Sequence, residues 1–255
     1  MHQLFDMSGR VAVVTGSTKG MGLAIARAIG TAGAKVVLSG RNAEAARAAA
    51  EELGRADGIT ARGLRCDIGD AESVRRFAQE AHEAFGRVDA LVLNAAPEAP
   101  FGSLLKQTPA DVDGVMSGYL NGNLLLIQAA LPEMIARKDG SIVLISSAIS
   151  TRGSKVLGLY GMAKAASDEF VRNLVAEVGP ANVNVNSINP STVRTDFSRV
   201  LWETPEAEQR AVAAIPLGRL AEPDEVAGLA LLLVSPAGRY INGQSIFVDG
   251  GRSAV

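Results

Sequence analysis

The chain has 255 residues, of which 47% are hydrophobic and 20% charged, a composition typical of a globular protein with a substantial core. Its formal net charge of -2 gives no reason to expect nucleic acid or an anionic membrane as a partner. The single cysteine, Cys66, excludes an intrachain disulfide and a thiolate metal cluster, so we expect no metal site. The start of the chain lacks the pattern of a signal peptide, and the apolar runs are too short to span a bilayer, so we predict a cytoplasmic protein.

Short apolar runs alternate with longer segments that have helical patterns. Strands that are apolar throughout and separated by helices are typical of a parallel sheet covered on both faces. We therefore predict one α/β domain over residues 1–255, a doubly wound Rossmann-type fold with about seven strands and helices on both faces. The predicted strands lie in 10–16, 34–40, 64–68, 88–94, 140–147, 183–190 and 245–251, and the clearest helices are 43–56, 70–85, a helix starting at Thr108 and Pro109, and 222–235.

The segment TGSTKGMG, residues 15–22, follows the first predicted strand and precedes a helix. Its glycines permit a tight turn and a close approach of the backbone to a pyrophosphate at a helix N-terminus. A purely structural strand-to-helix turn is the alternative, but the position after the first strand favours dinucleotide binding. The candidate binding residues here are Gly16, Ser17, Thr18, Lys19, Gly20, Met21 and Gly22.

The end of the second predicted strand indicates which dinucleotide is bound. An NAD site usually has a carboxylate there, bonded to the ribose 2′-hydroxyl. This chain has Ser39, Gly40, Arg41 and Asn42, and the first carboxylate is Glu44. The planar, permanently charged guanidinium of Arg41 suits a 2′-phosphate, and Lys19 can add a second cation. NADP(H) is therefore favoured over NAD(H), although both cations are also compatible with ordinary surface positions.

The segment YGMAK places Tyr160 and Lys164 four residues apart, on one face of a predicted helix. A carbonyl that accepts hydride needs a proton donor and dipoles aimed at the developing charge. A neighbouring cation favours the phenolate and is expected to lower the pKa of the tyrosine. Ser147, at the end of the fifth strand, can supply a second hydrogen bond. A surface pair of ordinary helix residues is the alternative.

Taken together, these motifs resemble those of the short-chain dehydrogenase/reductase family over nearly the whole chain, and its 3-oxoacyl-carrier-protein reductases in particular. The matching segments are TGSTKGMG, CDI at 66–68, LNAA at 93–96, Ser147 with YGMAK, NPSTVRT at 189–195, and the C-terminal region from PLGRLAEPDEVA to FVDGG. The resemblance implies an oxidoreductase with Tyr160 as acid or base, Ser147 bonded to the substrate oxygen, and Lys164 bonded to the nicotinamide ribose.

The resemblance also implies cofactor contacts along the strand ends. Asp67 and the backbone of Ile68 would hold the adenine. Asn94 and Ala95 would line the adenosine ribose, with Ser39 and Asn42 near it. Val193 would bind the nicotinamide carboxamide through its backbone, with Thr195 in support.

Tyr119 departs from the family pattern, because it stands where the family usually has an asparagine that supports proton transfer. The site either tolerates the change or has a reshaped floor and slower turnover. Asn121 and Asn123 follow closely in the sequence.

Two variable segments, 97–105 and a lid at about 197–215, are expected to close the substrate pocket. Their apolar residues favour a hydrophobic or aromatic ketone or alcohol, although Trp202 is equally compatible with packing of the lid. A 3-oxoacyl-carrier-protein reductase is the alternative substrate assignment, with Arg152, Lys155 and Arg172 as candidate contacts. A cofactor-binding scaffold or sensor with little turnover is the alternative of another class. The resemblance implies a homotetramer, with a dimer as the alternative.

Overall fold

A computed structural model describes residues 3–97 and 99–255 of the chain. Its centre is one seven-stranded sheet in the order β3-β2-β1-β4-β5-β6-β7, and every neighbouring pair of strands is parallel. The predicted doubly wound fold is therefore confirmed. The strands are β1 Val11–Val14, β2 Lys35–Gly40, β3 Ala61–Arg65, β4 Ala90–Leu93, β5 Gly140–Ile145, β6 Val183–Pro190 and β7 Ser245–Val248.

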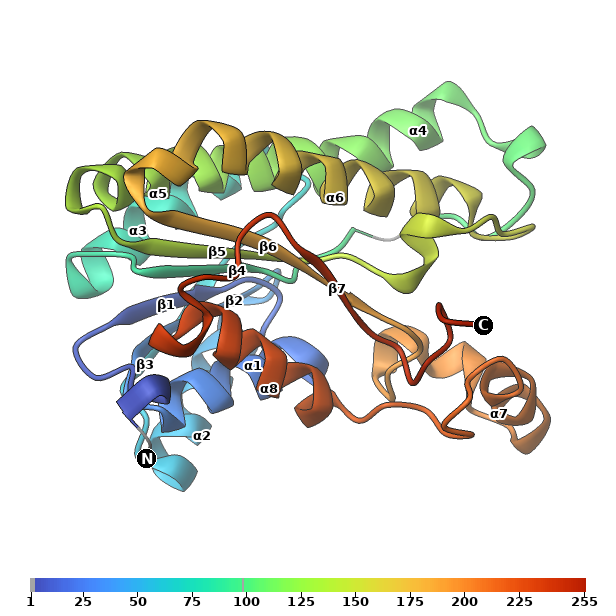
Figure 1. The fold of residues 1–255 in the computed structure, drawn as a ribbon, viewed down its shortest axis with the longest axis horizontal. Helices are drawn as coiled ribbons and strands as arrows, with labels where there is room; N and C mark the ends of the chain where they lie inside the picture. Colours follow the sequence, from blue (N-terminus) through green and yellow to red (C-terminus); the bar gives the residue numbers. More distant parts are fainter. Residues whose placement is uncertain (1–2, 98) are drawn as a thin grey trace.

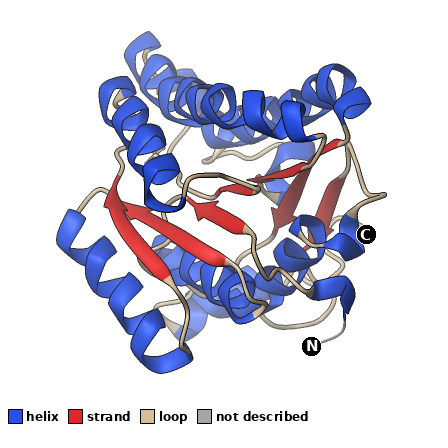
Figure 2. Ribbon diagram, turned by 90° about the vertical axis from the view of Figure 1, so that its left-hand side faces the viewer, coloured by secondary structure: helices blue, strands red, loops and turns tan. Residues whose placement is uncertain are grey.

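Helices cover both faces of the sheet (Figure 1). One buried apolar cluster joins α1, α2 and α8 to the sheet, and a second joins α3, α5 and α6 to the opposite face. Figure 2 shows the twisted strands between these two helical layers. The α-helices are α1 Gly20–Thr31, α2 Ala43–Asp57, α3 Ala71–Phe85, α4 Pro109–Met116, α5 Gly122–Arg137, α6 Gly158–Val178, α7 Pro205–Val212 and α8 Pro223–Val234. Shorter turns that matter below are the π-helical η3 Ser117–Asn121 and the 3-10 helices η4 Ala148–Thr151 and η6 Asp196–Leu201.

Local signals in the sequence account for where several helices begin. The side chain of Asn42 accepts hydrogen bonds from two amides of α2, and Asp70 accepts one from α3. Thr108 and Asp111 form a capping box before α4, with Pro109 at the first helical position, as predicted.

The third strand is the clearest difference from the sequence prediction. We expected it at 64–68, but it runs from Ala61 to Arg65 and pairs with β2 at Val36–Gly40. It is an edge strand with no fully buried residue, so the apolar run by which we located the other strands is missing here. Cys66 and Ile68 are buried in the turn that follows it.

The sheet order fixes where a ligand can bind. Strand β1 lies between β2 and β4, so the chain winds outward in both directions from this point. In open parallel sheets, the crevice at the carboxyl ends of the strands beside such a point is the usual ligand site. Across the described residues, we find no helix with both the length and the apolar character needed to cross a membrane.

Candidate active site

The glycine turn after β1 requires residues without a side chain at Gly16, Gly20 and Gly22. Gly16 and Gly20 have φ values of +60° and +57°, in the left-handed region. A Cβ on Gly16 would lie 2.8 Å from the Cα of Ala95, and one on Gly22 would lie 2.4 Å from the carbonyl oxygen of Gly16. The backbone of the turn is thus packed directly against α1 and the end of β4.

Thr15 joins the ends of two strands, and the sequence analysis did not single it out. Its hydroxyl accepts hydrogen bonds from the backbone amides of Asn94 and Ala95, both at 3.0 Å. The side chain of Asn94 donates in return to the carbonyl oxygens of Thr15 and Gly16. Asn94 and Ala95 therefore lie at the glycine turn, and the side chain of Asn94 also fixes the shape of the turn. The sequence signal that could have identified Thr15 is a polar residue directly after an apolar strand.

Ser17 and Ser39 are both buried and hold the glycine turn to the end of β2. The Ser17 hydroxyl donates to the carbonyl of Val14 and accepts from the amide of Ser39, and the Ser39 hydroxyl accepts from the amide of Gly16 at 3.3 Å. Thr18 lies over Gly40, where a Cβ would be 2.6 Å from its methyl group. Met21, in the first turn of α1, packs against the apolar cluster on this face of the sheet.

The charged and polar residues proposed for the 2′-phosphate lie at the mouth of the crevice. Lys19 and Arg41 are both exposed. Lys19 Nζ pairs with Asp196 at 2.8 Å, which connects the glycine turn to η6. Asn42 uses its side-chain oxygen to cap α2, so this oxygen already has hydrogen-bond donors within the chain.

Asp67 and Ile68 follow β3 at the same edge of the sheet. The Asp67 amide donates to the Ser73 hydroxyl, and its carboxylate accepts from the amide of Gly69. Ile68 is 7% exposed, and its carbonyl oxygen is close to Gly122, where a Cβ would approach to 2.2 Å. These contacts order the turn in which the adenine contacts were expected.

The structure brings Ser147, Tyr160 and Lys164 together beyond the end of β5. Ser147 is hydrogen-bonded to Tyr160 and also accepts a hydrogen bond from the amide of Ile149. Lys164 is only 4% exposed, and its Nζ donates to the carbonyl of Ile145 at 2.6 Å. The Nζ lies 5.6 Å from the centroid of the Tyr160 ring. The spacing of four residues thus places both groups on the inner face of α6.

Burial controls the proton affinity of both groups. It raises the pKa of Tyr160 to about 12, and the hydrogen bond with Ser147 opposes this rise. It lowers the pKa of Lys164 to about 7, although Asp168 favours the charged form. We expected Lys164 to lower the pKa of Tyr160. The pKa of Tyr160 is instead raised above its ordinary value, because removal from water disfavours the phenolate, just as it disfavours the ammonium of Lys164.

Tyr119 closes the floor of this site. It is 1% exposed, and its ring meets that of Tyr160 edge-on, with centroids 5.9 Å apart and planes at 73°. Its hydroxyl donates to the carbonyl of Pro97 at 3.3 Å, and Asn123 donates to its backbone carbonyl at 2.8 Å. Burial raises the pKa of the Tyr119 phenol well above its ordinary value.

A buried polar network that the sequence analysis missed lies behind Ser147. The side-chain amide of Asn189 donates to the Ser150 hydroxyl at 2.9 Å and to Asp168 at 2.8 Å, and makes a longer contact with the Ser147 carbonyl. Ser187 also donates to Asp168, at 2.8 Å. Asp168 lies one turn after Lys164 on α6, so the helix pattern that revealed the lysine could also have revealed this carboxylate.

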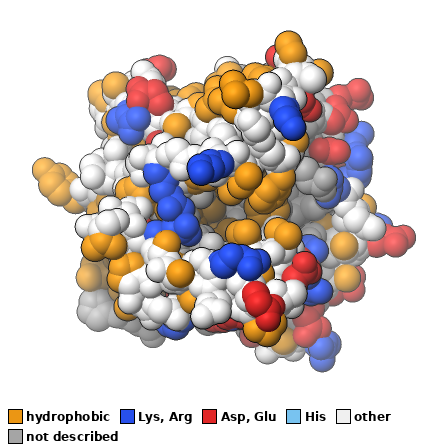
Figure 3. Space-filling view, turned by 90° about the vertical axis from the view of Figure 1, so that its right-hand side faces the viewer, with side chains coloured by type: hydrophobic (Ala, Val, Ile, Leu, Met, Phe, Trp, Pro, Cys, Tyr) orange, Lys and Arg blue, Asp and Glu red, His pale blue; other side chains and the backbone are white. Residues whose placement is uncertain are grey.

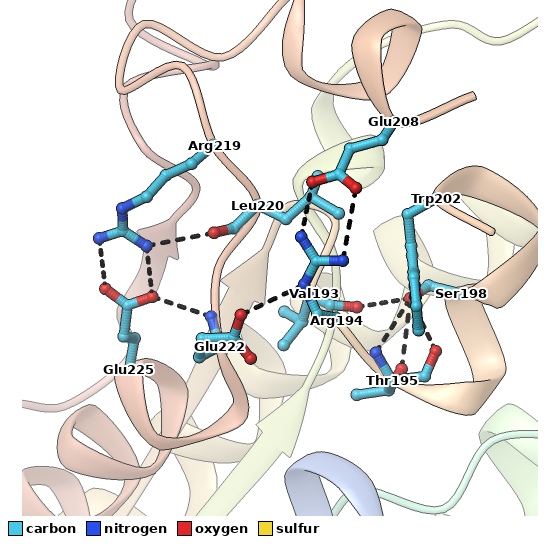
Figure 4. A network of polar contacts seen from close by, with 10 residues as sticks. All are labelled: Val193, Arg194, Thr195, Ser198, Trp202, Glu208, Arg219, Leu220, Glu222 and Glu225. Atoms are coloured by element: carbon cyan, nitrogen blue, oxygen red, sulfur yellow. Dashed lines mark hydrogen bonds and ion pairs between the residues drawn. The ribbon is translucent and has the colours of Figure 1, made fainter. Parts of the chain in front are cut away.

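Val193 and Thr195 lie between β6 and η6, where Ser198 organises the segment (Figure 4). The Ser198 hydroxyl donates to the Val193 carbonyl, and the Thr195 amide donates to Ser198 at 3.4 Å. Thr195 also reaches the glycine turn, since a Cβ on Gly20 would lie 3.3 Å from its methyl group. The glycine turn and the segment predicted to hold the carboxamide are therefore neighbours.

Trp202 belongs to the same network. Its indole nitrogen donates to Ser198 at 3.0 Å, and the guanidinium of Arg194 lies 5.0 Å from its ring centroid. Arg194 is held in turn by Glu208 on α7 and by Glu222 (Figure 4). These contacts favour the interpretation that Trp202 packs the lid segment against the body.

Exposed apolar side chains gather on the two segments expected to close the pocket. Phe197 and Val200 are 62% and 57% exposed on η6, and Phe101 is 60% exposed on the opposite segment. Figure 3 shows the corresponding side of the molecule, with hydrophobic side chains around a hollow and basic side chains at its rim. Glu98, within the expected segment 97–105, lies outside the described residues.

Comparison with known proteins agrees with this geometry. The family model described as "Enoyl-(Acyl carrier protein) reductase" matches residues 16–253. The chain belongs to the short-chain dehydrogenase/reductase family. It is therefore an oxidoreductase that acts on CH–OH groups or carbonyls, as the motifs predicted.

Several members of the short-chain dehydrogenase/reductase family match almost end to end. The chain is 37% identical to dehydrogenase/reductase SDR family member 4 of Bos taurus, over 96% of this chain and 88% of that protein. It is 36% identical to the 3-oxoacyl-[acyl-carrier-protein] reductase FabG of Aquifex aeolicus, over 96% and 98%.

Solved structures of the family superimpose closely. A 7α-hydroxysteroid dehydrogenase complexed with NADH and 7-oxo glycochenodeoxycholic acid is 33% identical, with a TM-score of 0.93 over 98% of this chain and 97% of that one. A gluconate 5-dehydrogenase from Burkholderia cenocepacia in complex with NADP and tartrate is 31% identical, with a TM-score of 0.93 over 99% and 98%. The family thus binds both nicotinamide dinucleotides.

Proposed function

We propose that this protein is an NADPH-dependent reductase of hydrophobic or aromatic ketones, with the reverse alcohol oxidation as its other direction. The observation that carries the proposal is the convergence of Ser147, Tyr160 and Lys164 beyond the end of β5, at the same carboxyl edge of the parallel sheet as the glycine turn after β1. A hydroxyl that holds its proton at neutral pH, next to a second hydroxyl, is what the reduction of a carbonyl requires.

The residues at the strand ends suit a nicotinamide dinucleotide. Gly16 and Gly22 allow the glycine turn to pack closely against the end of β4, and the turn lies at the N-terminus of α1, where a pyrophosphate would be stabilised. Asp67 would hold the adenine, and Val193 and Thr195 would hold the carboxamide. When bound, the cofactor supplies the hydride, and the protein supplies position and polarity.

The preference for NADP(H) over NAD(H) rests on charge. Lys19 and Arg41 lie at the mouth of the crevice, and the end of β2 carries no carboxylate between Ser39 and Asn42. A permanently charged guanidinium fits a 2′-phosphate, whereas a carboxylate would repel the phosphate. The ion pair of Lys19 with Asp196 is exposed, so a phosphate can compete for the ammonium at little cost.

The proton chemistry follows from the burial of the site. With its pKa raised to about 12, Tyr160 keeps its proton at neutral pH and can donate it from Oη to the carbonyl oxygen as negative charge develops there. Ser147 donates a second hydrogen bond to the same oxygen. Lys164 favours the resulting phenolate when it is charged, and its low pKa means that its charge depends on pH near neutrality.

The substrate class is proposed from the rim of the pocket. Exposed apolar groups, among them Phe101, Phe197 and Val200, stand on the segments that close over the site. The related steroid dehydrogenase was solved with a bulky, largely apolar ligand, whereas the related gluconate dehydrogenase was solved with tartrate. The apolar rim favours the first kind of ligand for this chain.

Reduction of a 3-oxoacyl group on a carrier protein is a second candidate, supported by the 36% identity to a FabG enzyme. It would need basic side chains for an acidic carrier. Arg152 and Lys155 are exposed, but Arg172 is paired with Glu169 at 2.8 Å, which weakens the case. A cofactor-binding sensor with little turnover rests on Tyr119 alone.

The state of the protein in the cell is also proposed. We expect a homotetramer, with a dimer as the alternative, formed through α4, α5 and α6. Leu124 and Ile135 on α5 are 37% and 41% exposed, which suits such a contact. We propose a cytoplasmic location, to which the free, buried thiol of Cys66 is suited.

The test is NADPH oxidation with aromatic ketones, aliphatic ketones and a 3-oxoacyl thioester, with NADH in parallel and Tyr160→Phe as the control. We expect fastest turnover with an apolar ketone and NADPH, and none with the phenylalanine variant. Fastest turnover with the thioester would favour the carrier-protein reductase instead. Tight NADPH binding without turnover of any substrate would contradict the enzyme assignment and favour the sensor.

A further inference from the structure

The ammonium of Lys164 is enclosed between two tyrosine rings. Its Nζ lies 4.6 Å from the ring centroid of Tyr119 and 5.6 Å from that of Tyr160. Both distances are within the range of a cation–π interaction, whose strength increases when the pair is removed from water. Lys164 and Tyr119 are 4% and 1% exposed, so water screens this contact very little.

A buried ammonium normally requires a carboxylate close to it. The hydrogen bond that the structure gives Lys164 Nζ is to the carbonyl of Ile145, a neutral group. Asp168 lies one turn further along α6 and favours the charged form of Lys164. Its carboxylate, however, accepts hydrogen bonds from Ser187 and Asn189, on the side of β6.

The other elements packed against α6 add no further carboxylate beside Lys164. Among the described residues, β5, β6 and η4 carry no ionisable side chain, and η3 contributes Tyr119 alone. Helix α4 carries Asp111, which caps its own helix through Thr108, and Asp113, which is exposed. Besides the Ile145 carbonyl and Asp168, the favourable surroundings of this charge are therefore the two aromatic faces.

Tyr119 is held in its position by features that leave its ring little freedom. It lies in the π-helical turn between α4 and α5, and such turns change the direction of side chains in a helix. A Cβ on Gly118 would lie 2.6 Å from Pro97, so the absence of a side chain allows the turn to approach the loop after β4. The hydrogen bond from the Tyr119 hydroxyl to the Pro97 carbonyl then fixes the plane of the ring.

We propose that Tyr119 is a positioning residue whose ring stabilises the ammonium of Lys164 in the place of an ion-pair partner and keeps it beside Tyr160. The ring carries this effect, and the hydroxyl serves only to orient it. The importance of the contact for catalysis rests on the function proposed above, but the contact itself does not.

The proposal can be tested by the titration of Lys164 itself. The chain has six lysines, so the protein can be labelled with ¹³C at the lysine ε-carbons, whose chemical shifts report protonation of each amine, and Lys164→Met identifies the signal. In the wild-type protein we expect a midpoint near pH 7. Tyr119→Phe, which keeps the ring, should move it by less than about 0.3 pH units. Tyr119→Leu should lower it by about 0.5 to 1.5 pH units, because the charged form loses its aromatic partner.

Two results would overturn the proposal. The first is a titration midpoint of Lys164 that does not change in Tyr119→Leu. The second is an equal shift of this midpoint in Tyr119→Phe and Tyr119→Leu, which would assign the effect to the hydroxyl. If the leucine variant does not fold, Tyr119→Met fills the same space without a ring and is subject to the same criteria.

Kinetics separate this inference from the proposed function. The alkaline limb of kcat/KM for ketone reduction should move to lower pH in Tyr119→Leu, by the amount found in the titration, and stay in place in Tyr119→Phe. An unmoved limb beside a shifted titration would overturn the positioning role. Absence of turnover in the wild-type protein would contradict the proposed function, and the titration would still decide the contact.

Discussion

The two ends of the proposed cofactor site are built on different principles. At the adenosine end, glycines and short polar side chains hold the backbone in one shape, through Thr15, Ser17 and Asn94. At the nicotinamide end, ionisable side chains are largely removed from water, with Lys164 buried and Tyr160 partly buried. The first end positions its ligand by shape, and the second prepares proton transfer by desolvation.

The two ends should therefore be sensitive to different changes. A site made of backbone fails when a side chain intrudes, whatever the pH. A site made of buried charges responds to pH and to the removal of one functional group, because each charge is stabilised by few partners. Substitutions at the two ends should separate these two kinds of failure.

Removing the hydroxyl of Tyr160 should have the largest effect on turnover. Tyr160→Phe leaves the ring in place but removes the proton donor, so we expect turnover to fall by roughly 10²- to 10⁴-fold. NADPH binding, measured by fluorescence titration, should stay within about threefold of the wild-type value, because the adenosine end is untouched. Retained turnover would show that Tyr160 is not the acid.

Adding one methyl group should disable the adenosine end. In Gly22→Ala, the new Cβ would lie 2.4 Å from the Gly16 carbonyl and 2.6 Å from the Asn94 amide nitrogen. We expect at least a tenfold loss of NADPH affinity and a destabilisation of about 1–3 kcal/mol. Gly228→Ala is the matched control, because a Cβ there, within α8, would have nothing within 4 Å and should stabilise the helix slightly. Equal effects in the two variants would argue against the close packing of the turn.

The cost of burying Lys164 should be visible as a pH dependence of stability. Its pKa falls from 10.5 to about 7 on folding, so between these values the unfolded chain binds the proton more strongly, and the stability of the fold rises with pH. Lys164→Met removes this cost. Its free energy of unfolding should exceed that of the wild type by a few kcal/mol at pH 7 and below, and the gain should disappear toward pH 10.

Urea denaturation at several pH values measures this gain, and Lys106→Met, at an exposed lysine, is the control. A gain that is the same at all pH values would mean that Lys164 is not a desolvated titrating group. The contacts of Thr15, Ser17 and Asn94 at the adenosine end should show no comparable pH dependence, since they join neutral groups.

Cofactor preference should show the smallest effect. Arg41→Glu places a carboxylate at the mouth of the crevice, so the KM for NADPH should rise by about tenfold, a change of roughly 1.4 kcal/mol, and the KM for NADH should fall. Arg47→Glu, an exposed site on α2 with the same change of charge, should leave the ratio of the two values in place. A similar change in the ratio of the two KM values in both variants would indicate a long-range effect of net charge rather than a contact between Arg41 and the 2′-phosphate.

Much of the architecture was predictable from the sequence because it depends on local signals. The alternation of apolar runs and helical segments predicted the parallel sheet, and residues such as Asn42, Asp70 and Thr108 marked helix starts. The edge strand β3 was misplaced because half-buried residues do not form an apolar run. Family membership also followed from motifs whose order along the chain is itself sequence information.

The types and spacings of Ser147, Tyr160 and Lys164 are properties of the chain, so the sequence was enough to propose them as the reacting groups. How these groups behave depends on the assembled fold. The direction of the Tyr160 pKa, the enclosure of Lys164 by Tyr119 and the support of Ser147 by Asn189 and Asp168 all arise from segments far apart in the chain. Desolvation depends on everything packed around a group, and that packing exists only once the sheet and its helices have assembled.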